Sequence, residues 1–100
     1  MSTGSDDDEL VRQQRMYIDR VDQTIVALLR ERIRLGLAVG EWKRTHAVPL
    51  RVEARERDVL ARVRQAAGGP LTPESVARIF AVVIEETAAA QARAESDHGC

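Results

Sequence analysis

The chain has 100 residues, a formal net charge of -1 at pH 7 and 31% charged residues, so its length accommodates one domain at most. This near-neutral charge excludes the strongly basic composition of proteins that bind nucleic acids or anionic membranes. The single cysteine, Cys100, leaves neither an intramolecular disulfide nor a cysteine-based zinc site available and is expected to be an incidental thiol.

Hydrophobic residues make up 44% of the chain but aromatic residues only 3%, so the core is expected to consist of Leu, Ile, Val and Ala in closely packed helices. No apolar run approaches the roughly 20 residues of a membrane span. The acidic start lacks the positive and then apolar order of a signal peptide. We therefore expect a cytoplasmic protein.

Both ends of the chain are predicted to be tails. Residues 1–8 are small, polar and acidic, a composition typical of a disordered terminus. Residues 95–100 are polar and are expected to form a flexible C-terminal tail. The folded helical domain is therefore predicted to span residues 9–94.

A long amphipathic helix is predicted from about Glu9 to Thr45. The segment contains no proline, and its apolar residues recur at the three- and four-residue spacing of one helix face. These residues are Ile18, Val21, Ile25, Leu28, Leu29, Leu35 and Val39. About 35 residues at 1.5 Å each make a helix of about 50 Å, longer than a compact domain of this size is wide. Such a helix cannot bury its whole apolar stripe against its own chain.

A second helix is predicted from about Val52 to Ala67. Pro49 separates it from the first helix, because proline lacks the amide donor and disfavours helix in the residue before it. The run Gly68-Gly69-Pro70 is a helix stop signal.

The third helix is expected to begin with Thr72 as its N-cap and Pro73 at its first position, and to fade near Ala90. The predicted fold class is therefore all-α, with three helices in each protomer. Because the first helix is too long for the other two to cover, we expect two chains to form an intertwined six-helix homodimer.

Two cations lie on the apolar stripe of the first helix. Arg32 and Lys43 are eleven residues apart, almost three full turns, so both face inward about 16 Å apart along the axis. Gly36 lies between them and is expected to open space there. The side chains could reach the rim of the stripe and be solvated there. The alternative, which we favour, is that they bind an anion.

Polar residues also lie on the core faces of the other two helices. Glu56 falls on the apolar side of the second helix, and Thr87 and Gln91 continue the apolar stripe of the third. Taken alone, Thr87 is typical of a core residue whose hydroxyl is satisfied by the backbone. The occurrence of polar groups on all three core faces favours a binding pocket, because burying charge is costly unless it is paired.

Arg15 lies to the side of the same stripe, some 25 Å along the axis from Arg32, so both cannot reach one pocket within a protomer. In an antiparallel dimer Arg15 could reach the pocket of the partner chain. The other interpretation is a solvated surface arginine.

These residues resemble the AroQ class of chorismate mutases over about residues 10 to 92. The resemblance is carried by the order and spacing of five stretches. They are Arg15-Met16-Tyr17-Ile18-Asp19-Arg20-Val21-Asp22, Leu28-Leu29-Arg30-Glu31-Arg32, Val39-Gly40-Glu41-Trp42-Lys43, Pro49 with Arg55-Glu56-Arg57, and Ile84-Glu85-Glu86-Thr87-Ala88-Ala89-Ala90-Gln91. The resemblance implies a homodimer of interlocked three-helix protomers with two active sites shared between the chains.

The resemblance also implies the role of each site residue. Arg15 of the partner and Arg32 would hold the two carboxylates of the substrate, and Thr87 would make a further carboxylate contact. Lys43 and Gln91 would hydrogen-bond the ether oxygen. Glu56 would hold the ring hydroxyl and Arg55 would order the pocket. Val52 departs from the pattern, since some family members have an acidic residue there and valine offers only its backbone amide.

The implied reaction is the intramolecular Claisen rearrangement of chorismate to prephenate, in phenylalanine and tyrosine biosynthesis or a related aromatic secondary pathway. It needs no cofactor, metal, nucleophile or general base. Two alternatives on the same scaffold are an isochorismate-pyruvate lyase and a mutase for 4-amino-4-deoxychorismate, which the valine at position 52 keeps open. An alternative of another class is a non-catalytic helical dimerisation or regulatory module.

Overall fold

The computed structural model describes residues 3–98 and the side chains of residues 8–97. Met1, Ser2, Gly99 and Cys100 lie outside the described residues. The outermost parts of both predicted tails and the expected role of the Cys100 thiol therefore stay predictions.

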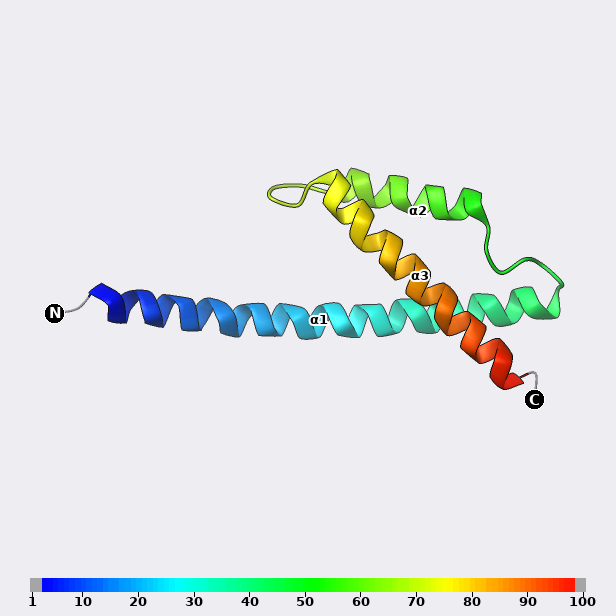
Figure 1. The fold of residues 1–100 in the computed structure, drawn as a ribbon, viewed down its shortest axis with the longest axis horizontal. Coiled ribbons are helices and arrows are strands. Elements are labelled where there is room, and N and C mark those ends of the chain that lie inside the picture. Colours follow the sequence, from blue (N-terminus) through cyan, green and yellow to red (C-terminus); the bar gives the residue numbers. More distant parts are fainter. Residues whose placement is uncertain (1–2, 99–100) are drawn as a thin grey trace. The chain divides into compact units, whose positions relative to one another are not determined.

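Three helices make up the described chain: α1 (Thr3–Thr45), α2 (Glu53–Ala66) and α3 (Pro73–His98). Figure 1 shows them in chain order, and residues 3–98 contain no β-strand. The prediction of an all-α fold with three helices and a long first helix is therefore confirmed. No helix within the described residues is long and apolar enough to cross a membrane.

Two helices are longer than the sequence pattern predicted. α1 begins at Thr3 instead of about Glu9. α3 continues to His98 instead of fading near Ala90, because alanine is the strongest helix former and no glycine or proline follows until Gly99. The helices thus extend into both segments predicted as tails.

The boundary between α2 and α3 follows from its turn residues. Leu71 N donates to Gly68 O at 3.1 Å, and Gly69 has a φ of 58°, a left-handed conformation that glycine adopts without strain. Thr72 then caps α3, since its Oγ1 accepts a 3.1 Å hydrogen bond from Ser75 N. The predicted N-cap is confirmed.

The C-terminal end of α1 is also capped by backbone hydrogen bonds around a residue in the left-handed conformation, but this residue is not a glycine. Val48 N donates to Lys43 O at 2.9 Å and Ala47 N donates to Arg44 O at 3.5 Å, the pairing of a Schellman cap. Ala47 occupies the left-handed position of this cap, with a φ of 55°. An L-residue pays a steric cost there that glycine avoids.

The chain divides into two compact units, residues 1–31 and residues 32–100. In the described part of the first unit, the apolar side chains of α1 are all solvent-exposed except the half-buried Leu29. The exposed ones are Leu10, Val11, Met16, Tyr17, Ile18, Val21, Ile25, Val26 and Leu28, at 46% to 64% relative exposure. Within residues 8–31, nothing covers the stripe.

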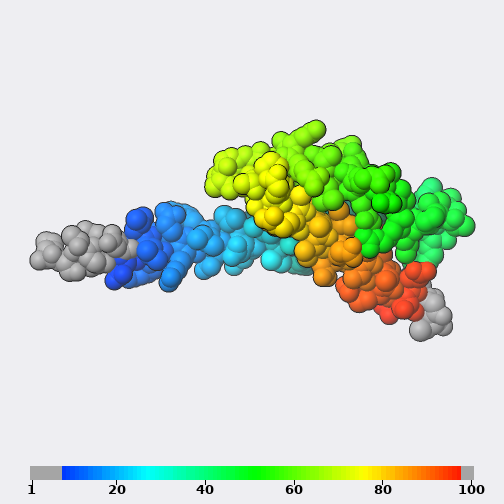
Figure 2. Space-filling model, turned by 45° about the horizontal axis from the view of Figure 1, so that its top comes forward, coloured from blue at the N-terminus to red at the C-terminus, as the bar shows by residue number. Residues whose placement is uncertain are grey.

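The second unit contains the C-terminal part of α1 together with α2 and α3. α2 packs against α3, as the contact between them in Figure 2 shows. α3 crosses α1 at Gly36, where an added Cβ would lie only 2.5 Å from Thr87 Cγ2. The core is small and centres on α3. Its buried side chains are those of Val76, Ala77, Val83, Thr87 and Ala90, and Gly40 of α1 is buried as well.

Candidate active site

A cavity of about 340 Å³ lies within the second unit, between the C-terminal part of α1, the connector of residues 46–52, α2 and α3. Seven of the eight predicted site residues line it. They are Arg32, Lys43, Val52, Arg55, Glu56, Thr87 and Gln91. Because they come from three helices and a connector, only the folded chain brings them together.

Arg32 reaches the cavity from α1 and is held by α3. Its Nη1 donates a 2.9 Å hydrogen bond to Thr87 Oγ1, and the Thr87 hydroxyl in turn donates to Val83 O at 2.9 Å. Thr87 is buried, with 9% relative exposure. The threonine therefore has both the backbone partner expected of a core residue and a contact with the predicted anion-binding arginine.

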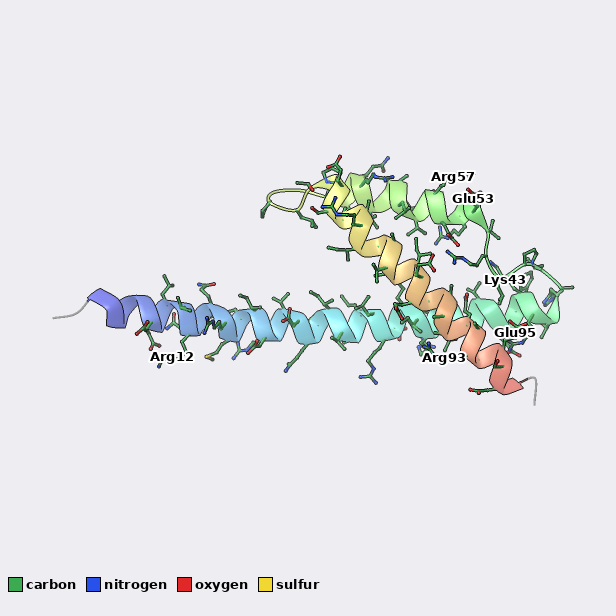
Figure 3. The ribbon with its side chains drawn as sticks, in the orientation of Figure 1. Arg12, Lys43, Glu53, Arg57, Arg93 and Glu95 are labelled. Carbon is green, nitrogen blue, oxygen red and sulfur yellow. The ribbon has the colours of Figure 1, made fainter. Side chains whose placement is uncertain are left out.

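Lys43 lines the same cavity from the C-terminal end of α1, close to the connector, as its label in Figure 3 shows. Its Nζ donates to Leu50 O at 3.2 Å. An ammonium group carries three donors, so two remain for other partners. The connector carbonyl thus fixes the ammonium group at the cavity wall.

Gln91 lies at the crossing of α1 and α3. Its Nε2 donates to Gly36 O at 2.8 Å, which leaves the second hydrogen of the amide for another acceptor. A Cβ added at Gly40 would lie 3.2 Å from Gln91 Cγ. Gly36 was expected to open space between the two cations, and it lines the cavity together with them. The absence of a side chain at Gly36 also lets α3 approach closely enough for Thr87 and Gln91 to reach α1.

Glu56 is held by Arg51, a residue that the sequence analysis missed. Arg51 Nε and Nη2 donate to the two carboxylate oxygens of Glu56, both at 2.8 Å. The same guanidinium donates to Glu85 of α3 at 2.9 and 3.2 Å. The hydrogen bonds from Arg51 hold the pKa of the Glu56 carboxyl below its usual range. Little in the sequence identifies Arg51 as a site residue, because it lies on the connector, where no helical periodicity defines an inward face.

Arg55 and Val52 line the cavity at the start of α2. Arg55 Nη1 donates to Asp58 Oδ2 at 2.9 Å, and its side chain is 64% exposed. Val52 O accepts hydrogen bonds from Arg55 N and Glu56 N at 3.0 and 3.1 Å, which begins the helix. The neighbouring Arg57, quoted with this stretch, pairs instead with Glu53 at 3.2 Å on the exposed side of α2 (Figure 3).

The charges on the cavity wall are not all neutralised. Arg51 is paired with Glu56 and Glu85, and Arg55 with Asp58. Among side chains 8–97, neither Arg32 nor Lys43 forms an ion pair; their hydrogen-bond partners are the Thr87 hydroxyl and the Leu50 carbonyl. Two half-buried cations without a carboxylate partner are suited to a ligand that carries two negative charges.

Two residues quoted in the sequence analysis lie elsewhere. Arg15 belongs to the first unit and does not line the cavity. Trp42 is 54% exposed and stacks on His46 with ring centroids 4.1 Å apart and an interplanar angle of 14°. Neither residue lines the cavity.

Comparison with known proteins identifies relatives for most of the chain. Residues 14–92 match the family model described as chorismate mutase type II. The chain is 45% identical over 84 residues to a bifunctional chorismate mutase/prephenate dehydratase of Neisseria gonorrhoeae. It is 31% identical over 80 residues to the protein of the same description from Aquifex aeolicus.

A solved structure has the same fold. The chorismate mutase (form II) from Thermus thermophilus matches with a TM-score of 0.80 and 26% identity, over 83% of this chain and 94% of that one. The sequence relatives are much longer. The alignments cover 84% and 76% of this chain but only 23% and 22% of the two bifunctional proteins.

Proposed function

The chain belongs to the type II chorismate mutase family, and from this membership we propose that it catalyses the rearrangement of chorismate to prephenate in the cavity described above. The observation that carries the proposal is the pair of unneutralised cations, Arg32 and Lys43, on one cavity wall. Chorismate is a dianion, and prephenate is a precursor in aromatic amino acid biosynthesis.

The rearrangement requires only groups of the kind that line this cavity. The rearrangement breaks a C–O bond while a C–C bond forms within the same molecule, so no group transfers to the protein. The enzyme must hold the substrate in its compact, reactive conformation, which cationic groups gripping both carboxylates can do. In this proposal Arg32, oriented by Thr87, grips one carboxylate.

Negative charge grows on the ether oxygen as the C–O bond breaks. In this proposal Lys43 Nζ and Gln91 Nε2 donate to that oxygen. Their other hydrogen bonds, to Leu50 O at 3.2 Å and Gly36 O at 2.8 Å, fix both donors in advance. Donors fixed before the reaction stabilise the transition state more than the substrate, because they need no reorganisation when the charge develops.

The remaining contacts concern the ring. We assign Glu56 to the ring hydroxyl, since an ionised carboxylate is an acceptor only. Arg55 contributes positive charge at the rim, and Val52 contributes its backbone amide. Thr87 orients Arg32 and can meet a substrate carboxylate only by giving up its hydrogen bond to Val83 O.

The proposal includes a homodimer in which Arg15 of one chain completes the cavity of the other. Two observations support it. Arg15 is absent from its own chain's cavity, and the apolar stripe of α1 around it is exposed, with Ile18 at 55% and Val21 at 56%. A second copy of the chain would cover this stripe and place an additional cation near Arg32. We further propose a cytoplasmic location.

Three assays on the purified chain test the function. Loss of chorismate with formation of prephenate is the expected result. Formation of pyruvate and salicylate from isochorismate would instead support a lyase, and preferential turnover of 4-amino-4-deoxychorismate would support the mutase for that analogue. No turnover of any of the three would contradict the proposal and favour a non-catalytic helical module.

A further inference from the structure

Arg51 is the most highly connected cation in the cavity wall, and the proposed reaction gives it no part. It lies at the end of the connector between α1 and α2, directly after Leu50, whose carbonyl holds Lys43. Its guanidinium contacts Glu56 on α2 and Glu85 on α3 with four hydrogen bonds of 2.8 to 3.2 Å. One side chain therefore ties the connector to both helices.

The contact with Glu56 has the geometry that fixes a carboxylate most completely. Nε and Nη2 of Arg51 each donate to a different oxygen of Glu56 at 2.8 Å, a bidentate pair that sets the plane of the carboxylate as well as its position. Glu85 accepts from Nη1 and Nη2, the adjacent edge of the guanidinium, so Nη2 donates to both carboxylates. Arg51 is thus itself anchored to α3 and can act as a rigid support.

Glu56 shares the cavity with further cations. Arg32 and Lys43 of α1 and Arg55 of α2 line the same space. The bidentate pair with Arg51 fixes the plane of the Glu56 carboxylate among these cations.

We propose that Arg51 is a positioning residue, which presents Glu56 as an oriented, ionised acceptor for the ring hydroxyl. The inference rests on the proposed function for its substrate. It does not depend on that function for the coupling between Arg51 and Glu56.

The coupling has a direct spectroscopic readout. The charged groups that line the cavity with Glu56 are Arg51 of the connector, Arg32 and Lys43 of α1, and Arg55 of α2, and Glu85 of α3 is linked to it through Arg51. Replacing Arg51 by Gln removes the cation that lowers the pKa of Glu56, so that pKa should rise toward the ordinary glutamate value of about 4.3.

Carbon-detected NMR titration of the glutamate carboxyls measures this shift in the full chain. The matched control is Arg57→Gln, which removes an arginine of α2 that pairs with Glu53. A raised Glu56 pKa in Arg51→Gln and an unchanged one in Arg57→Gln support the proposal. Equal Glu56 titration in Arg51→Gln and the unaltered chain overturns it. If Arg51→Gln does not fold, Arg51→Lys replaces it, with an intermediate shift expected because lysine keeps the charge but not the bidentate contact.

Kinetics then separate positioning from a general loss of structure. Loss of an oriented hydroxyl contact weakens binding of substrate and transition state alike, so Arg51→Gln should raise KM about tenfold with a much smaller change in kcat. The acid limb of kcat/KM should move to higher pH with the Glu56 pKa, and Arg51→Lys should recover part of the loss. An unchanged KM and acid limb would overturn the positioning role. If the unaltered chain does not turn over chorismate, the proposed function fails, and the NMR titration still decides the coupling.

Discussion

Arg32 and Thr87 meet across the crossing of α1 and α3, where Arg32 Nη1 donates a 2.9 Å hydrogen bond to the Thr87 hydroxyl. The hydroxyl proton is directed to Val83 O at 2.9 Å, so the oxygen presents its lone pairs to the guanidinium. Thr87 thereby fixes the orientation of the cation that we assign to a substrate carboxylate. The absence of a side chain at Gly36 makes this contact possible, because α3 approaches α1 closely there.

Replacing Thr87 by Val should lower kcat/KM for chorismate about tenfold, because the substitution keeps the shape of the side chain and removes one hydrogen bond to a charged group. Thr87→Ser, which keeps the hydroxyl, is the control and should retain most of the activity. Steady-state kinetics on both variants provide the measurement. Equal activity of the Val and Ser variants would exclude an orienting role for the hydroxyl.

Lys43→Ala and Arg32→Ala should each abolish measurable turnover while leaving the helical content unchanged. Each removes a cation for which no ion pair exists within side chains 8–97, so neither leaves a carboxylate unpaired. Loss of Lys43, a fixed donor to the developing charge, should raise the reaction barrier by about 3 to 4 kcal/mol, and loss of Arg32 removes the grip on one substrate carboxylate. Turnover assays and far-UV circular dichroism measure the two effects. Near-normal activity in either variant would contradict the site assignment.

The helices and most of the cavity wall could be predicted from the sequence because both follow from periodicity. Arg32 and Lys43 were found as cations on an apolar stripe, and Thr87 and Gln91 as its polar continuation on α3. Arg51 could not be found in this way, because the connector has no regular repeat that assigns an inward face.

The helix ends were predicted less well than the helix centres. Thr72 was identified because its side chain caps α3 through a local hydrogen bond. The left-handed conformation of Ala47 had no sequence signal, since glycine or asparagine is the usual residue there. The backbone adopts it because the hydrogen bond from Val48 N to Lys43 O closes α1.

Gly36→Ala should destabilise the fold by about 1 to 3 kcal/mol, although alanine is the better helix former. The added Cβ would lie 2.5 Å from Thr87 Cγ2, far inside contact distance. Chemical denaturation at a fixed protein concentration measures the change. Gly40→Ala is the matched control and should cost less, because its Cβ meets the flexible Gln91 side chain at 3.2 Å.

A compensating substitution tests whether the contact with Thr87 causes the loss of stability in Gly36→Ala. Thr87→Ser removes the methyl group that the new Cβ would meet and keeps the hydroxyl. The double variant Gly36→Ala, Thr87→Ser should therefore be more stable than Gly36→Ala alone. Simple additivity of the two single effects would show that the steric contact is not the source of the loss.

Ala47→Gly should stabilise the chain by about 0.5 to 1 kcal/mol. Ala47 has a φ of 55°, a conformation that costs an L-residue roughly 1 to 2 kcal/mol, and part of the gain is offset by the greater freedom of glycine in the unfolded chain. The control is Ala61→Gly in the middle of α2, which should destabilise by up to about 1 kcal/mol. Denaturation midpoints of the two variants should move in opposite directions, and a parallel shift would contradict the strain at Ala47.

Sharing of the active sites between two chains can be tested by mixing inactive variants. If Arg15 completes the partner's cavity, Arg15→Ala and Lys43→Ala are each inactive alone. A heterodimer of the two has one intact site, because the cavity of the first chain receives Arg15 from the second. Refolding an equal mixture should make half of the dimers heterodimers and restore about a quarter of the normal activity.

The matched control is a mixture of Arg32→Ala with Lys43→Ala. Both substitutions damage the cavity of their own chain, so no combination of these two chains contains an intact site and no activity should return. Recovery in the first mixture and none in the second requires that Arg15 act across the interface. Absence of recovery in both mixtures, with heterodimers demonstrated by mass spectrometry, would show that Arg15 does not complete the site from the second chain.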